Sequence, residues 1–458
     1  MSLERKWRQM TRQLELPLQP KGEAPRGERS GEAQTATHGD ERSGTDDLLE
    51  QIVARDNCIQ ALRRVRRNKG SPGMDGMSVG ELSAHLVAHW PGIREQLLAG
   101  TYRPKPVLRR EIPKPNGGTR QLGIPCALDR FIQQATLQVL QPRFDPAFSE
   151  HSYGFRPGRS AHQAILEAKR YMEEGRHWVV DVDLEKFFDR VNHDLLMGRL
   201  ARRIEDKRVL KLIRGFLNAG MLADGVVIER AEGTPQGGPL SPLLANVLLD
   251  EVDKELERRG HAFVRYADDC NVYVRSKRAG DDVMAMLRGL FTNLRLHVNE
   301  GKSAVARPEE RKFLGYTFQI DSEGTVHPVV AKPSIDRFKD RVRAATCRVV
   351  GRSISQVVAE LRSFIPGWKH YFRLANTPRT FHSIDGWIRR RLRALQFKQW
   401  KNAKTIVREL RARRVPGQFV LAAAKHAGRW WRMARHTALQ TALPSIYFDA
   451  IGLPRLDA

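Results

Sequence analysis

The sequence predicts an α+β fold: a mixed region of helices and strands with an antiparallel sheet, followed by an all-helical, strongly basic region. Short apolar runs bounded by turn-forming residues predict strands between residues 102 and 334. From residue 335 onward the apolar spacing is helical almost throughout. The charge divides in the same way. Residues 331–458 hold 27 basic and 7 acidic side chains, so they carry most of the chain's formal net charge of +26. Such a surplus indicates a polyanionic partner, nucleic acid first, although a merely basic scaffold protein is the alternative on charge alone.

The chain is expected to contain five segments. Residues 19–45 have almost no large apolar side chains, so they cannot bury enough surface to offset the entropy of ordering. The segments are a disordered tail at 1–45, an N-terminal extension at 46–101, a mixed region at 102–334, a helical region at 335–420, and a small basic segment at 421–458. The last segment is interpreted as DNA-binding or as a cap on the helical region.

Within these segments the periodicity predicts individual elements. Strands are expected on either side of the turn at 115–118, and at 177–184, 225–230, 302–306 and 312–320, with a hairpin at 263–274. Helices are expected at 46–68, 128–141, 161–174, 193–203, 207–218, 242–259 and 281–296. A Gly-rich loop at 69–76 follows the first helix.

The four cysteines lie far apart and form no CxxC pair, which argues against a zinc knuckle or a disulfide framework. The sequence shows no leader-like apolar run and no stretch of about 18 apolar residues. We therefore expect a cytoplasmic protein without a membrane partner.

Carboxylates interrupt two apolar runs in the centre of the chain. The first run is VVDVDLEKFFD at 179–189, and the second is FVRYADDCNVYV at 263–274. A carboxylate inside an apolar strand is costly unless it is paired or binds a cation. Asp268 and Asp269 alone could form an ordinary turn, and Asp183 alone could end a strand. Together they predict one cleft whose oxygens suit hard divalent cations such as Mg²⁺.

These segments resemble the reverse transcriptases encoded by bacterial group II introns. YADD at 266–269 is similar to the signature hairpin of the family, and 179–189 is similar to its motif A. The resemblance implies a right-hand polymerase, with fingers and palm at 102–334 and a helical thumb after them. It implies that Asp183, Asp268 and Asp269 are catalytic and bind two Mg²⁺ ions, with the carbonyl of Leu184 as a further ligand. Asp181 is the reserve candidate, and the sequence does not decide whether Mn²⁺ can substitute.

The resemblance also implies a nucleotide pocket. Phe188, five residues after Asp183, matches the aromatic gate against a ribose 2′-hydroxyl, and an ordinary core Phe is the alternative. GTPQGGPLSP at 233–242 is similar to the family motif at the templating pair. The residues expected to contact the nucleotide are Lys114, Arg120, Phe188, Gln236 and Lys302. SYGFRPGRS at 152–160 matches a further block that shapes this pocket.

Residues 335–420 resemble the thumb, or X, domain linked to maturase activity, including GWKHYF at 367–372. The stretch at 384–401 places cations on a helix that is expected to lie along an RNA backbone, with a solvated amphipathic helix as the alternative. The expected RNA-binding residues are Arg389, Arg390, Arg391, Arg393, Lys398 and Lys401.

The function implied is RNA-directed DNA polymerisation with maturase-type binding of intron RNA. The expected partners are an RNA template, structured intron RNA, a DNA primer or target, and dNTPs; the oligomeric state stays open. The sequence shows no metal-ligand pattern after Arg414, so it resembles the branch without an endonuclease. The alternatives are a domesticated reverse transcriptase in phage defence or DNA repair, and an RNA-binding splicing cofactor with little polymerase activity.

Overall fold

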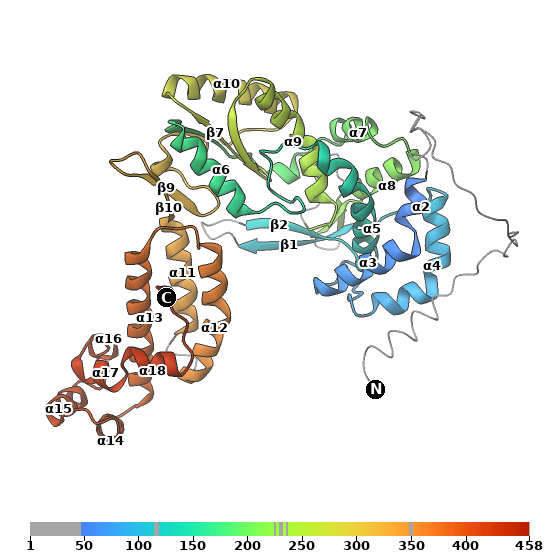
Figure 1. Cartoon of the computed structure of the whole chain (residues 1–458). Helices are drawn as coiled ribbons and strands as arrows, with labels where there is room; N and C mark the ends of the chain where they lie inside the picture. Colours follow the sequence, from blue (N-terminus) through green and yellow to red (C-terminus); the bar gives the residue numbers. More distant parts are fainter. Residues whose placement is uncertain are drawn as a thin grey trace, which may run out of the picture. The chain divides into compact units, whose positions relative to one another are not determined.

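A computed structural model describes residues 47–113, 119–223, 226–228, 232–234, 237–347 and 351–457. The expected disordered tail at 1–45 lies outside them. The chain divides into two compact units, which we describe separately (Figure 1). The first contains residues 1–149, 184–252 and 290–297, and the second contains residues 150–183, 253–289 and 298–458.

The first unit combines helices with a four-stranded sheet of order β2-β1-β4-β5. The strands β1 and β2 form the expected antiparallel hairpin, whereas β1 and β4 run parallel. The elements are α2 (Leu48–Ile52), α3 (Arg55–Arg67), α4 (Leu82–Leu98), β1 (Val107–Pro113), β2 (Thr119–Ile124), α5 (Ala127–Phe144), η1 (Asp145–Ala147), η2 (Phe187–Asp189), α7 (His193–Ala201), α8 (Lys207–Leu217), β4 (Met221–Ala223), β5 (Val226–Ile228) and most of α9 (Ser241–Arg258).

The second unit begins with an antiparallel sheet of order β6-β7-β3-β8. Its elements are α6 (Ala161–Glu173), β3 (Trp178–Val182), β6 (Ala262–Tyr266), β7 (Asp269–Val274), α10 (Lys277–Asn293), β8 (Ala304–Ala306), η3 (Pro308–Glu310) and the hairpin β9 (Tyr316–Ile320) and β10 (Val326–Val330). The sequence did not predict the strands β4 and β10 or, in the first unit, the helix α4.

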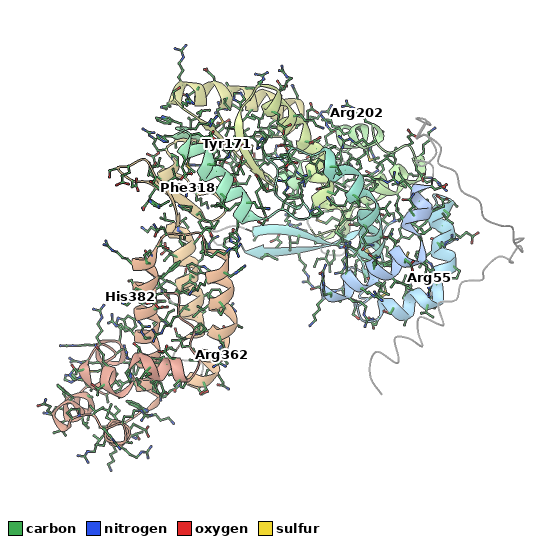
Figure 2. The ribbon with its side chains drawn as sticks, viewed as in Figure 1. Arg55, Tyr171, Arg202, Phe318, Arg362 and His382 are labelled. Atoms are coloured by element: carbon green, nitrogen blue, oxygen red, sulfur yellow. The ribbon has the colours of Figure 1, made fainter. Side chains whose placement is uncertain are left out.

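Alternation of side chains gives this sheet two apolar faces. Val179 and Tyr273 point to the face that packs with Ala164 and Ala168 of α6 and Phe318 of β9 (Figure 2 labels Tyr171 and Phe318 of this core). On the other face α10 approaches so closely that a Cβ on Gly280 would lie 2.5 Å from Val305. The sheet is therefore a rigid layer between helices.

The rest of the second unit is helical, as expected, and shares one core. The elements are α11 (Lys332–Ala345), α12 (Ile354–Tyr371), α13 (Pro378–Gln399), α14 (Ala403–Ala412), α15 (Gly417–Lys425), α16 (Trp430–Met433), α17 (Thr437–Ala442) and α18 (Ser445–Ala450). Leu439 and Phe448 are fully buried against residues of α12 and α13. The boundary expected at residue 420 thus falls inside a packed core, and DNA binding by residues 421–458 stays a prediction. Among the helices in the described ranges, none is long and apolar enough to cross a bilayer.

Candidate active site

The register of the second unit's sheet brings the motif carboxylates together. Val182 at the end of β3 pairs with Cys270, and Tyr266 pairs with Asp269 across the β6–β7 hairpin. Asp183 directly follows Val182, and Asp269 directly precedes Cys270. Both therefore lie at the same end of neighbouring strands, and Asp268 lies in the β6–β7 turn. Because side chains alternate, Asp181 and Asp269 point to the same face of the sheet. The interpretation of the chain as a polymerase requires that the carboxylates of Asp183, Asp268 and Asp269 lie near one another.

The raised pKa of the Asp269 carboxyl indicates a site that favours a bound cation. Burial raises the pKa of its carboxyl well above the ordinary value, and the neighbouring carboxylates of Asp181, Asp268 and Asp183 raise it further. Like charges in a partly dry cleft destabilise one another unless a cation is bound. The local repulsion therefore favours cation binding.

Two cations already contact the site. Arg311 forms an ion pair with Asp181 at 2.6 Å, while burial still raises the pKa of that carboxyl. Lys302, expected near the nucleotide, lies 3.5 Å from an oxygen of Asp183 and is 65% exposed. Asp181 is thus ion-paired with the guanidinium of Arg311, whereas Asp183 faces the exposed ammonium of Lys302. This difference favours Asp183 over Asp181 as the metal ligand.

The loop before β8 fixes the backbone of Asp183. The amide of Asp183 donates to Ser303 Oγ at 3.0 Å, and the amide of Asn299 donates to the Asp183 carbonyl at 2.8 Å. Both partners belong to the NEGKS segment at 299–303. The sequence pointed only to Lys302 of this segment, and it did not reveal the support that Asn299 and Ser303 give to Asp183.

A buried arginine supports the turn that carries Asp268. Arg265 is 1% exposed and forms a two-pronged ion pair with the fully buried Asp253, at 2.7 and 2.5 Å. Its remaining nitrogen donates to the carbonyl of Ala267 at 2.9 Å, where the backbone adopts a φ of 61°. Gly154 packs against the same turn so closely that an added Cβ would lie 2.1 Å from the Ala267 nitrogen. The turn is therefore held by Arg265 and Gly154 together.

The carboxylates do not form a ready-made metal cage. Within the described ranges, no group of three or more His, Cys, Asp or Glu side chains has the geometry to hold a metal ion. Mg²⁺ does not require such a cage, because it is usually bound by one or two carboxylates together with substrate phosphates and water. The oxygen-only donor set and the mutual repulsion at Asp269 fit such a cation.

The other expected nucleotide contacts belong to the first unit or lie outside the described residues. Lys114 and Gln236 lie outside them, and Arg120 is described only through its backbone pairing with Ile112. The Phe188 ring is buried and packs edge-on against Phe187, with 5.1 Å between the ring centroids. Its backbone carbonyl accepts a hydrogen bond from the Thr234 amide at 2.7 Å. Leu184 is 6% exposed. The roles of these residues stay predictions.

The cations expected to bind RNA are largely engaged within the helical region. Arg390 stacks on Trp431 at 3.8 Å, and Arg391 donates to Thr346 at 2.6 Å. Arg393 donates to the Leu443 carbonyl at 2.9 Å, and Lys398 lies 4.9 Å from the Trp430 ring. Arg389 is half-buried and Lys401 is exposed. Their RNA contacts stay a prediction, but the first four have a structural task that the sequence did not reveal.

An antiparallel sheet that presents carboxylates at one end, followed along the chain by a basic helical region, defines the class of right-hand nucleic-acid polymerases. Two family models match in the same order. The reverse transcriptase (RNA-dependent DNA polymerase) model matches residues 112–318, and the group II intron maturase-specific domain matches residues 335–415. The chain therefore contains a reverse transcriptase region followed by a group II intron maturase-specific region.

Two curated relatives agree with this assignment. The chain is 40% identical to "Protein YkfC" of Escherichia coli, over 46% of this chain and 57% of that protein. It is 43% identical to "Group II intron-encoded protein LtrA" of Lactococcus lactis, over 51% of this chain and 50% of that protein. The chain therefore spans only about half the length of these curated relatives. A solved "Partial Cas6-RT-Cas1--Cas2 complex" is 27% identical with a TM-score of 0.36, over 55% of this chain and 43% of that one.

Proposed function

We propose that this protein is an RNA-directed DNA polymerase whose reaction takes place at the carboxylate end of the β6-β7-β3-β8 sheet. The observation that carries the proposal is the register that brings Asp183, Asp268 and Asp269 to one end of neighbouring strands. Two Mg²⁺ ions held there would activate a primer 3′-hydroxyl and neutralise the pyrophosphate that leaves a dNTP. The match of residues 112–318 to the reverse transcriptase family supports RNA as the template.

The chain's own residues position the reaction. The Ser303 and Asn299 contacts fix the backbone of Asp183, and Arg265 fixes the turn that precedes Asp268. Such preorganisation is what phosphoryl transfer demands, since it depends on positioning and electrostatics more than on covalent chemistry by the protein. Lys302 is near enough to Asp183 to neutralise its charge before substrate arrives, and its exposed ammonium is free to turn toward a triphosphate.

The decisive experiment is primer extension with dNTPs on an RNA template, comparing the wild type with Asp268→Asn. We expect the variant to lose at least about 100-fold in rate, because a neutral amide replaces a charged oxygen ligand. Its affinity for the annealed primer–template should be retained. Asp281→Asn, an exposed change on α10, is the matched control and should extend at the wild-type rate. Equal extension by Asp268→Asn and the control would refute the proposal.

We further propose that the helical region at 335–457 binds structured intron RNA. Its support is the match of residues 335–415 to the maturase-specific domain, together with the basic surplus of residues 331–458. Phosphate contacts release counterions, so this affinity should fall steeply with added salt. A filter-binding titration with intron RNA across KCl concentrations measures it, and a salt-independent affinity would contradict it.

A further inference from the structure

The end of the β6-β7-β3-β8 sheet opposite the aspartates is basic. Ala262 pairs with Tyr273, Trp178 pairs with Val274, and Val179 pairs with Ala306, so these four strands begin or end side by side. The residues just beyond these pairs are cationic or imidazole side chains on all four strands: Arg259 and His261 before β6, Arg275 after β7, Arg176 and His177 before β3, and Arg307 after β8. We call these six residues the basic end of the sheet.

A hollow of about 480 Å³ opens at the basic end. Its rim includes Arg176, Arg259 and Arg275, and its floor includes the apolar side chains of Val274, Val283 and Met286. Asp282 is the one acidic side chain among its described lining residues. The hollow thus combines an apolar floor with a cationic rim, which is the chemistry of a nucleotide: a flat base and a phosphate.

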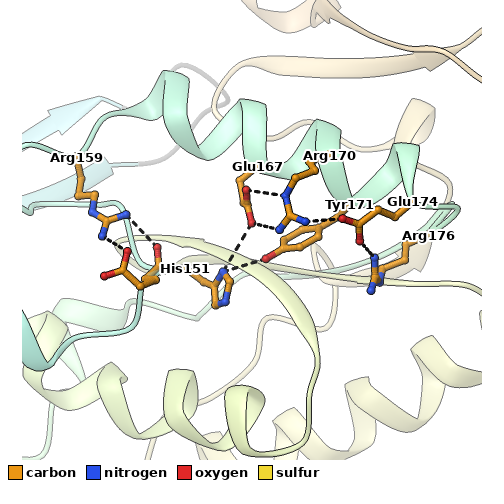
Figure 3. Close-up of polar contacts among 8 residues, drawn as sticks. His151, Arg159, Glu167, Arg170, Tyr171, Glu174 and Arg176 are labelled. Carbon is orange, nitrogen blue, oxygen red and sulfur yellow. Dashed lines mark hydrogen bonds and ion pairs between the residues drawn. The ribbon is translucent and has the colours of Figure 1, made fainter.

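The arginines of the rim differ in how firmly they are held. Arg176 pairs with Glu174 and lies 5.6 Å from the Tyr171 ring, at the end of the polar chain along α6 (Figure 3). Arg259 pairs with Glu255 yet is 43% exposed. Arg275 is exposed, and its side chain has no hydrogen-bond or ion-pair partner within the residues that the structure describes. The hollow is therefore lined by two guanidinium groups that have acidic partners and by the exposed guanidinium of Arg275.

We propose that the basic end binds the sugar–phosphate backbone of structured RNA, with an unpaired base entering the hollow. This rests on the proposal that RNA is the protein's partner. Guanidinium forks match phosphate oxygens, and single-stranded bases are bound on apolar and aromatic floors. The five residues of β3 separate this end from the catalytic carboxylates by roughly 15 Å or more. The RNA bound here is consequently not the primer terminus that reacts at Asp268.

The test compares two double variants by fluorescence anisotropy with a labelled RNA stem–loop that carries single-stranded flanks. The site variant is Arg259→Gln with Arg275→Gln. The control variant is Arg258→Gln with Arg278→Gln, which removes the same charge from neighbouring exposed positions outside the lining. We expect the site variant to bind the stem–loop about 10-fold more weakly and to lower the salt slope by between one and two, since two phosphate contacts are lost. The control should change affinity by less than about threefold, because Arg258 and Arg278 do not line the hollow and exposed charges that make no direct phosphate contact are screened by salt.

Two further readouts keep the result interpretable. Thermal unfolding of the site variant should match the wild type, because both arginines are partly exposed. Primer extension on a short annealed RNA–DNA duplex should also be unchanged, which separates this site from the catalytic one. Equal stem–loop affinity for the site and control variants would overturn the proposal, and binding of an acidic protein would then be the better explanation of the surface. Failure of the polymerase proposal would appear differently, as absent extension by the wild type.

Discussion

At the scale of single residues, the environment of a carboxylate decides its chemistry. Asp181 and Asp183 are two positions apart in one motif, yet Arg311 pairs with the first and exposed Lys302 approaches the second. The sequence singled out Asp183, Asp268 and Asp269 through the spacing to Phe188 and the YADD turn, and the sheet register brings them to one end of neighbouring strands. It could not reveal Arg311, because a residue 130 positions away along the chain enters the site only through folding.

Asp129 offers a test of burial outside the active site. It accepts hydrogen bonds from the Tyr102 hydroxyl at 2.8 Å and the Lys105 amide at 3.2 Å, but burial raises the pKa of its carboxyl to about 6. The native state therefore holds a proton that the unfolded chain has released between about pH 4 and 6, so stability falls as pH rises through that window. We expect Asp129→Asn to lose this pH dependence, measured by urea unfolding at several pH values. An unchanged slope between pH 4 and 6 would contradict the buried assignment.

At the scale of elements, hydrophobic periodicity was a good guide. The hairpin at 263–274, the strand at 177–184 and the helices at 161–174 and 242–259 were all found within a few residues of their bounds. The missed elements are informative: Pro91 and Gly92 interrupt the pattern of α4, β4 has three residues, and His327 and Pro328 interrupt β10. A pattern that is very short or broken by proline and glycine resembles a loop, so packing partners rather than local pattern supply the stability of these elements.

The β6–β7 turn allows an element-scale prediction. Gly154→Ala would place a methyl group 2.1 Å from the Ala267 nitrogen, so the turn must shift. We expect the extension rate to fall by about 100-fold, as for small misplacements of catalytic groups, while primer–template affinity stays near the wild type. Gly289→Ala on α10 is the control, since an added Cβ there meets nothing within 4 Å. Wild-type extension by Gly154→Ala would show that the turn is not held as described.

The buried ion pair beneath the turn makes a second prediction. Asp253→Ala would leave the guanidinium of Arg265 buried without its carboxylate, and breaking such a pair costs about 3–5 kcal/mol. We expect a lower midpoint of thermal unfolding and, at temperatures where the variant is folded, a reduced extension rate. The single change Arg265→Lys should also lower the extension rate, because a lysine cannot contact both Asp253 and the Ala267 carbonyl with a planar fork.

At the scale of the whole molecule, each of the two units has its own apolar core, and the helical region within the second is a single body that includes the last forty residues. The sequence suggested a small basic segment after residue 420, because Trp430, Trp431 and several arginines lie there. The structure instead gives those arginines and tryptophans intramolecular partners, such as Arg390 on Trp431. Contacts of this kind depend on three-dimensional packing and leave no periodic signal in a sequence.

The shared core of the helical region can be tested directly. Phe448→Ala removes a fully buried ring and should destabilise the region by about 3–5 kcal/mol. Ile446→Ala, at a side chain that is 74% exposed, should have little effect. Limited proteolysis under native conditions reports the difference, and equal resistance of the two variants would mean that residues 421–457 are dispensable for the core.

The most direct test of the catalytic assignment is a single-turnover measurement of dNTP incorporation by Asp183→Asn and Asp181→Asn on the same RNA template. The two changes remove the same charge from positions that lie two residues apart in one motif. A difference in rate therefore reports the different roles of the two carboxylates. The account predicts a loss of at least about 100-fold for Asp183→Asn and a loss of less than about tenfold for Asp181→Asn, whose partner is Arg311. Wild-type incorporation by Asp183→Asn would contradict it.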